Sequence, residues 1–214
     1  FSCGLCAIGT SSTYPLSQDA CVDCIPGTYG TGGGQCIYCE AGKFSPVAKA
    51  TNESVCEKCP VGKYSPRPGD YTCTYCPPGS ECPRRGMSNY DVCQPGKYQG
   101  KPRSSSCIHC PRGPYNNEAG YASCALCPAG KFNSDTGSKI PSACQKCAPG
   151  KYSTQNGTAE CQQCGTGQFQ QDAGQSWCFS CKEVYDDSTM TNNADFTGCS
   201  VDETLRGDTL IETM

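Results

Sequence analysis

The hydrophobic positions of this chain include a series of single aromatic residues that recur at a regular interval. Each of these follows the same pattern: a cysteine, two variable residues, a glycine and one further residue. The aromatic residues are Tyr29, Phe44, Tyr64, Tyr98, Tyr115, Phe132, Tyr152 and Phe169. Proline and glycine after the cysteine predict a tight turn, because proline fixes φ and glycine accepts positive φ. We therefore expect small hairpin-like loops with short strands, each with one ring packed against a disulfide.

The cysteines repeat with the same period. Cys-x-x-Cys pairs begin at Cys3, Cys21, Cys36, Cys56, Cys73, Cys107, Cys124, Cys144, Cys161 and Cys178. Successive pairs begin 15 to 20 residues apart, except for one gap of 34 that contains Cys82 and Cys93. A second glycine often stands four residues before the closing cysteine, where it turns the loop back. Such small units cannot stand alone, so neighbouring units must stack as in other repeat proteins.

The composition agrees with a scaffold held together by disulfides. Leu, Ile, Val and Phe make up 24 of 214 residues, about 11%, which is too few for a conventional core. The 23 cysteines supply the alternative and indicate an oxidising, extracellular or cell-surface location. The expected fold class is small disulfide-rich tandem repeats, forming an elongated rod of short β-hairpin-like loops with little regular secondary structure.

The position of the motif suggests how the cysteines pair. If the cysteine before Gly-x-aromatic opens a loop, the first cysteine of the next pair closes it. This simple scheme pairs Cys6 with Cys21, Cys24 with Cys36, Cys39 with Cys56, Cys59 with Cys73, Cys76 with Cys82, Cys93 with Cys107, Cys110 with Cys124, Cys127 with Cys144, Cys147 with Cys161, Cys164 with Cys178 and Cys181 with Cys199. It leaves Cys3 unpaired within this segment, so we expect its partner upstream of Phe1. A nested scheme, joining two Cys-x-x-Cys pairs first to third and second to fourth, stays open.

Other uses of these cysteines are less well supported. Zinc ribbons have similar spacing, but many successive units, Pro-Gly turns and a single histidine, His109, favour disulfides. Redox and Ser-His-Asp catalysis need a pocket or buried cleft that such loops can hardly build. The acidic stretch 185–195 lacks the glycine turn and terminal glutamate of a loop-type calcium site. We expect no catalytic residue, no metal and no cofactor.

Two sequons and the charge indicate the kind of partner. Asn52-Glu-Ser and Asn156-Gly-Thr are N-glycosylation sequons in loops between cysteines, where an exposed asparagine is expected.

The net charge of -3, with basic residues mostly scattered singly, argues against binding to nucleic acid or to anionic membrane surfaces. No stretch approaches the roughly 20 apolar residues that span a bilayer. The expected partners are copies of the chain itself or other extracellular proteins, without direct membrane insertion.

The repeat resembles a known family. The string C-x2-C-P-x-G-x-[YF]-S, followed by a glycine and another C-x2-C, resembles the ephrin-receptor-type cysteine-rich repeat. More distantly, it is similar to the cysteine-rich domains of tumour-necrosis-factor receptors. The resemblance covers about residues 3–181 and fades at Cys6, where Ser11 replaces the aromatic residue, and at Cys181. It implies extracellular rods, stalks and ligand-displaying surfaces, and it names no ligand.

The repeat pattern divides the chain into four segments. Residues 1–76 and 93–181 are regular cysteine-rich repeats, residues 77–92 an irregular joint, and residues 182–214 a non-repeat C-terminal segment. The last of these contains Arg206-Gly-Asp, an integrin-adhesion tripeptide that is common by chance. We expect a structural module, a disulfide-stapled rod that builds a fibre, coat, flagellar hair or matrix by self-association. The alternative is a receptor ectodomain or stalk that binds a protein ligand.

Overall fold

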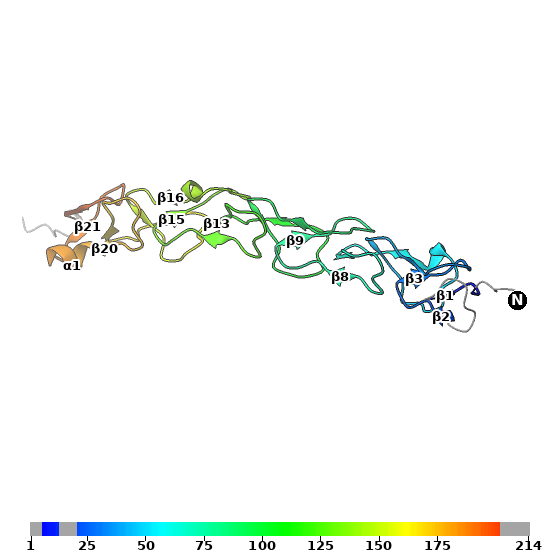
Figure 1. Ribbon diagram of the computed structural model, residues 1–214. Coiled ribbons are helices and arrows are strands. Elements are labelled where there is room, and N and C mark those ends of the chain that lie inside the picture. Colours follow the sequence, from blue (N-terminus) through cyan, green and yellow to red (C-terminus); the bar gives the residue numbers. More distant parts are fainter. Residues whose placement is uncertain (1–5, 13–20, 202–214) are drawn as a thin grey trace, which may run out of the picture. The chain divides into compact units, whose positions relative to one another are not determined.

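The computed structural model describes residues 6–12 and 21–201 and divides into two compact units (Figure 1). Unit 1 comprises Phe1–Gln94, Tyr98–Ile108 and Ala119–Ser123, and unit 2 comprises Pro95–Lys97, His109–Glu118 and Cys124–Met214. The division falls within strands β11 (Lys97–Tyr98) and β12 (Ile108–His109). Cys3 and the tripeptide at 206–208 lie outside the described residues.

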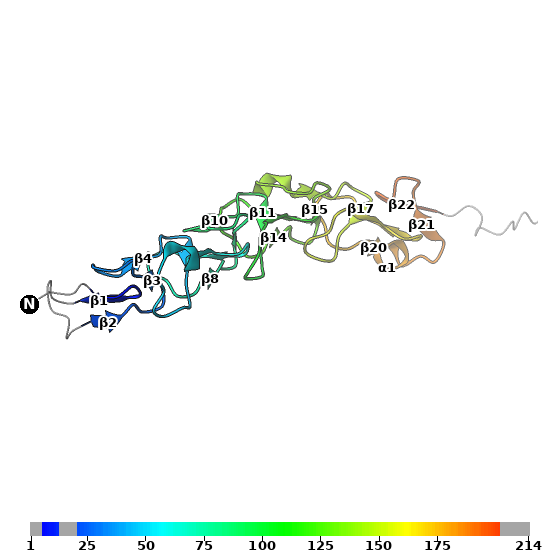
Figure 2. The ribbon, with the colours of Figure 1, turned by 90° about the vertical axis from the view of Figure 1, so that its right-hand side faces the viewer.

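Regular structure in both units consists almost entirely of antiparallel hairpins with strands of two or three residues (Figures 1 and 2). In unit 1 the hairpins are β1 (Thr10–Ser12) with β2 (Cys21–Asp23), β3 (Thr28–Tyr29) with β4 (Ile37–Tyr38), β5 (Lys43–Phe44) with β6 (Glu57–Lys58), β7 (Lys63–Tyr64) with β8 (Thr74–Tyr75), and β9 (Ser80–Glu81) with β10 (Asp91–Val92). These short hairpins confirm the predicted fold class of small disulfide-rich repeats.

Unit 2 repeats the arrangement and ends in a short helix and a last hairpin. Its hairpins are β13 (Pro114–Tyr115) with β14 (Ala125–Leu126), β15 (Lys131–Phe132) with β16 (Gln145–Lys146), β17 (Lys151–Tyr152) with β18 (Gln162–Gln163), β19 (Gln168–Phe169) with β20 (Phe179–Ser180), and β21 (Met190–Asn192) with β22 (Cys199–Val201). Helix α1 (Cys181–Tyr185) lies beside β20 and β21 (Figure 2). Short 3-10 helices, Glu53–Val55 and Pro141–Ala143, precede two of the closing cysteines.

The predicted tight turn opens each regular loop. In the loop opened by Cys59, the amide of Lys63 donates to the carbonyl of Pro60 at 3.1 Å, and Gly62 between them has φ of 81°. Positive φ at the third turn position is the feature that requires glycine in this kind of turn. The turn therefore fixes where β7 begins.

Disulfides close the loops in the structure. The 22 cysteines from Cys6 to Cys199 form eleven bonds, and these are the pairs of the simple scheme given above. Sequence separations run from 12 to 18 residues, except for 6 between Cys76 and Cys82. A closed loop of this usual size stabilises a chain by roughly 3 kcal/mol in the chain-entropy model.

Backbone hydrogen bonds join each loop to the next. The amide of the turn glycine donates to the carbonyl of the residue that follows the aromatic position in the next loop. The pairs are Gly27 with Ser45, Gly42 with Ser65, Gly62 with Cys82 and Gly79 with Gln99 in unit 1, and Gly96 with Asn116, Gly113 with Asn133, Gly130 with Ser153 and Gly150 with Gln170 in unit 2. We call this series the glycine ladder, and its donor–acceptor distances lie between 2.7 and 3.0 Å.

The turn glycines also touch the loop after next. A Cβ atom built on Gly27 would lie 2.0 Å from the carbonyl oxygen of Gly69, and one on Gly79 would lie 2.0 Å from that of Gly120. In unit 2 the corresponding distance from Gly113 to the oxygen of Gly157 is 1.9 Å. Real Cβ atoms do not approach an oxygen this closely, so only glycine permits the contact. Each loop is thus packed against two successors.

Apart from the cysteines, the most buried side chains are polar ones that sequence reasoning missed. The residue after the aromatic position is 0% exposed at Ser45, Ser65 and Gln170, and 2% exposed at Asn133. By contrast, the predicted ring is only half-buried in most loops, and Phe169 at 5% exposure is the exception. Hydrogen bonds satisfy these polar groups, some of them between loops: the Asn133 side-chain amide donates to the carbonyl of Pro114 in the preceding loop at 2.8 Å. Buried polar groups need such partners to avoid a desolvation cost.

Residues 77–92, expected as an irregular joint, take part in the same ladder. Gly62 donates to the carbonyl of Cys82, and Gly86 donates to that of Cys59 at 2.8 Å. Cys82 therefore has the same ladder position in its loop as Ser45 has in the loop Cys39–Cys56. Unlike Ser45, it also closes its loop, by a disulfide to Cys76. Met87 packs against this disulfide, with Tyr64 and Tyr90 beside it.

The loop between Cys181 and Cys199 also joins unit 2, although its sequence does not show the motif. The amide of Gln170 donates to the carbonyl of Phe196 at 2.9 Å, and a Cβ on Gly150 would lie 2.4 Å from the oxygen of Asp195. Backbone contacts between loops thus extend past the last recognisable repeat. Among the described residues, no helix is long and apolar enough to cross a membrane.

Replacement of Gly79 by alanine tests the close approach, with Gly120 as its matched control. Both residues have φ near 80°, but a Cβ on Gly120 would meet nothing within 4 Å. We expect Gly120→Ala to cost about 1–2 kcal/mol from the left-handed backbone alone. Gly79→Ala should cost roughly 1–3 kcal/mol more, because its Cβ collides with a carbonyl oxygen. Thermal unfolding of the oxidised proteins measures the difference, and equal losses would argue against the close contact.

Candidate interaction surface

The most regular exposed feature is the second strand of each hairpin. In most hairpins this strand consists of the two residues between the cysteines of a Cys-x-x-Cys pair, which we call the joint residues. The cysteines face inward, and the joint residues between them are exposed in strands β4, β6, β8, β12, β14, β16 and β18. Several are large and apolar, with exposures of 39% to 62%: Val22, Ile37, Tyr38, Tyr75, Ile108, Leu126 and Phe179. Exposed apolar side chains mark an interaction surface where they form a contiguous patch.

The second joint residue rests on a glycine two loops later in the chain. Tyr38 lies over Gly69, and Leu126 lies over Gly157. His109, the only histidine, lies over Gly137 in the same way, with Nδ1 2.7 Å from where a Cβ would be. The second glycine of the motif thus leaves room for a side chain from an earlier loop. His109 is accounted for as a packing residue of this kind.

Two loops have a long basic residue in place of that glycine. Lys49 and Arg103 have positive φ values of 57° and 69°, which are strained for residues with a Cβ. Each faces a complementary second joint residue: the Lys49 ammonium lies 3.0 Å from the Asp23 carboxylate, and the Arg103 guanidinium lies 3.7 Å from the Tyr75 ring centroid. An ion pair and a cation–π contact therefore replace the contact on glycine.

Lys43 in β5 has two carboxylate partners. Its ammonium lies 2.8 Å from Glu53 and 3.1 Å from Glu40. The side-chain bond to Glu53, and then that to Glu40, raises the pKa of Lys43, and the same bond to Lys43 lowers the pKa of Glu53. This local neutralisation matters because Lys58 stands directly opposite Lys43 in the hairpin.

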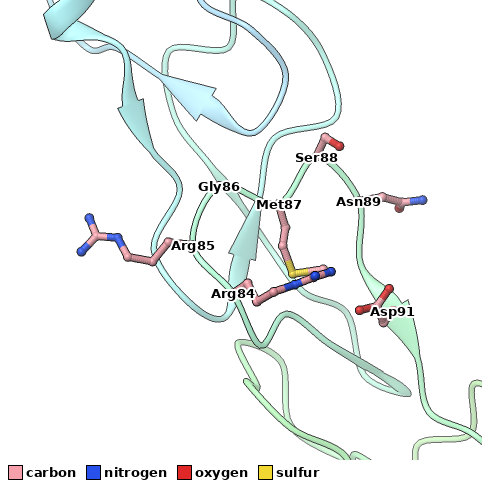
Figure 3. A pocket seen from close by; sticks show the side chains of 7 residues that line it. All are labelled: Arg84, Arg85, Gly86, Met87, Ser88, Asn89 and Asp91. Atoms are coloured by element: carbon pink, nitrogen blue, oxygen red, sulfur yellow. The ribbon is translucent and has the colours of Figure 1, made fainter.

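A hollow in unit 1 is lined by residues of the segment 84–91 and has a volume of about 410 Å³. In Figure 3, the side chain of Arg84 lies alongside Met87, and that of Arg85 points away from it. Asp91 lies on the opposite side of the hollow from Arg85. The two guanidinium groups therefore do not converge on one point, as binding of a small anion would require. Met87 is buried against the Cys76–Cys82 bond, so this segment serves mainly to cover that disulfide.

An aromatic cluster lies near the end of the described chain. The rings of Phe179 and Tyr185 lie 5.8 and 6.4 Å from that of buried Phe169. Trp177, the only tryptophan, meets Phe179 edge to face at 6.3 Å. Trp177 is 53% exposed and Tyr185 52% exposed. Exposed aromatic residues of this kind are common anchors of protein interfaces.

The zinc and calcium alternatives, which the sequence did not favour, concern cysteine sulfur atoms and acidic side chains whose partners the structure gives. The sulfur atoms of the 22 described cysteines are bonded to one another, so they cannot act as thiolate ligands. The residues that the structure describes contain no cluster of three or more His, Cys, Asp or Glu side chains that could hold a metal ion. In the acidic stretch, the Asp195 carboxylate accepts bonds from the hydroxyl and amide of Thr197, which lower its pKa.

The fold and the disulfides define this chain as a tandem array of small cysteine-rich loops. Residues 96–144 match the family described as tyrosine-protein kinase ephrin type A/B receptor-like. The chain therefore carries ephrin-receptor-like cysteine-rich repeats. The matched part covers the loops from Gly96 to Cys144, and the same loop structure continues on both sides of it. No curated protein matches this chain.

The two sequons are open to modification in the structure, and we expect both to carry glycan. Asn52 and Asn156 are exposed. The Oδ1 atoms accept backbone bonds, from Ser54 at 3.0 Å and from Ala129 at 2.9 Å. A glycan attached to Nδ2 leaves both bonds intact. The intact mass of the protein from a secreting host should therefore fall after enzymatic deglycosylation, in two steps distinguished by Asn52→Gln and Asn156→Gln. An unchanged mass would refute the expectation.

Proposed function

We propose that this chain is a non-catalytic extracellular module that presents its joint residues to other proteins. The observation that carries the proposal is that several joint residues are large, apolar and exposed, on hairpins that are closed by disulfides. Rigid presentation favours binding, because little conformational entropy is lost when the partner docks. The joint residues are thus available as contacts without disturbing the ladder beneath them.

The same chemistry supports an extracellular location and a non-catalytic role. Eleven disulfides persist only in an oxidising compartment, which supports a secreted or cell-surface protein. His109 lies over Gly137 on a hairpin surface and is not placed in a buried cleft as a general base would be. The match to ephrin-receptor-like repeats supports a receptor-type binding module over a free-standing structural protein.

Self-association into a larger assembly is the second candidate, and the charge distribution favours it. Residues 128–151 carry four lysines and one aspartate, a net charge of +3. Residues 182–201 carry one lysine and four carboxylates, a net charge of -3. Opposite charges on separate segments of one chain allow copies to attract one another.

Site-specific photo-crosslinking tests the proposed binding role. A benzophenone side chain placed at Ile37 or at Ile108, both nearly half exposed, should form covalent adducts with an extracellular protein when the full chain is displayed in its native medium. The same group at Ser134, an exposed polar loop position, serves as the control and should form few adducts. If Ile37 and Ile108 give no adducts, or no more than Ser134, the joint residues are not the binding surface.

A further inference from the structure

Two loops of this chain form a matched pair that differs in charge. The loops Cys39–Cys56 and Cys127–Cys144 have the same sequence separation of 17 residues. Both open with a strand of sequence Lys-Phe, and both close just after a 3-10 helix. Both are followed by a joint whose second residue is lysine, and this lysine lies over a later glycine: Lys58 over Gly86 and Lys146 over Gly174. Each loop can therefore serve as the reference for the other.

In both hairpins two lysines stand directly opposite each other. The register places Lys43 across from Lys58 in β5–β6, and Lys131 across from Lys146 in β15–β16. Like charges in cross-strand positions repel, because their Cβ atoms lie only about 5 Å apart. Both hairpins therefore form in spite of this repulsion.

Only the first of the two pairs is neutralised. Lys43 binds Glu40 and Glu53, whereas the equivalent positions in the second loop are Pro128 and Pro141. Within residues 6–12 and 21–201, no carboxylate lies within 4 Å of either Lys131 or Lys146. Lys146 is exposed and Lys131 partly exposed, so both charges are available to an external anion. The hairpin β15–β16 thus carries a positive charge pair without an internal counter-charge.

We propose that this lysine pair binds the acidic segment 183–187 of a second copy of the chain. This inference rests on the self-association considered above and specifies its contact. Glu183 and Asp186 are exposed in and just after helix α1, with Asp187 next to them. The segment that contains the lysine pair, residues 128–151, has a net charge of +3. The segment that contains the acidic residues, 182–201, has a net charge of -3.

Each charged group lies in the same short segment as exposed apolar side chains. Ile140, at 57% exposure, belongs to the loop between the strands of Lys131 and Lys146. Tyr185 and Trp177, each more than half exposed, belong to the aromatic cluster that includes α1. Apolar anchors surrounded by charges are the usual composition of a specific protein interface.

A second copy fits the charges better than a long polyanion does. A sulfated polysaccharide would be attracted by Lys131 and Lys146, but it would carry negative charge along its whole length beyond the site. It would also meet the acidic residues 182–201, which belong to the same compact unit as the lysines. The acidic segment of a second copy is short, so its negative charge is confined to the lysine pair and does not extend along the whole site.

Sedimentation velocity of the oxidised full chain, at low and at high ionic strength, tests the proposal. The wild type should associate at low salt and dissociate at high salt, where charge screening is strong. Lys131→Glu with Lys146→Glu should weaken association by roughly tenfold or more, because both charges then repel the acidic segment. Lys58→Glu is the control, because Lys58 has the position in the first loop's hairpin that Lys146 has in the second. This change should alter association by less than about twofold.

A charge-swap experiment provides the specific readout. The chain with Glu183→Lys and Asp186→Lys should fail to associate with itself but should associate with the Lys131→Glu/Lys146→Glu chain. Because each variant folds independently of the contact, recovery in the mixture also shows that neither has merely unfolded. Failure of the mixture to associate would overturn the proposed contact.

The remaining outcomes separate the proposal from the function on which it rests. If the wild type stays monomeric at every concentration, both self-association and this contact are wrong. If the wild type associates and the double lysine variant associates equally well, only the contact is wrong. Binding of heparin that is lost in the Lys131→Glu/Lys146→Glu chain, without self-association of the wild type, would identify a polysaccharide site instead and overturn the proposal.

Discussion

The close approach of glycine backbones between loops is the constraint on which the rest of this structure depends. The turn glycines of the loops from Gly27 to Gly150 donate their amides to the next loop and closely approach backbone atoms beyond it. No side chain can take its place, because a Cβ on Gly113 would lie 1.9 Å from a carbonyl oxygen. Disulfides restrict the unfolded chain, but the glycine ladder decides how the closed loops stack. A chain with so few aliphatic residues can fold because its core consists of backbone, sulfur and small polar side chains.

This arrangement leaves the outer surface free to vary. Because the interior contacts are made by backbone atoms and cysteines, the joint residues range from Asp23 through Tyr38 to Lys146 without altering the hairpin. The exceptions at Lys49 and Arg103 show the limit of this freedom. There, a residue with a Cβ occupies a positive-φ position, and the joint residue facing it has the matching charge or ring. Surface chemistry and loop stacking are thus coupled at a few places and independent elsewhere.

Sequence reasoning could predict the loops because the signal for each loop is local. Cysteine spacing and the Gly-x-aromatic motif predict the turn, the short strands and the cysteine that closes each loop. All three are read from the residues of one repeat. The contacts between loops could not be predicted, because they join residues about 20 to 45 positions apart whose identities vary. The buried position after the ring holds glycine, serine, asparagine or glutamine, and in one loop Cys82, so it shows no single residue type. The different charge environments of Lys43 and Lys131 likewise become visible only when the hairpin register is known.

Amide hydrogen exchange of the native, oxidised protein tests the glycine ladder most directly. The ladder predicts strong protection at the amides of Gly42, Gly79, Gly113 and Gly130, each of which donates to a carbonyl of the next loop. Gly34 is an internal reference: it is exposed, and no hydrogen bond of its amide is found among the described residues. Exchange that is slower at the four ladder glycines than at Gly34 by several orders of magnitude would support the account. Exchange at the same rate in all five would contradict it, because the loops would then be held by their disulfides alone.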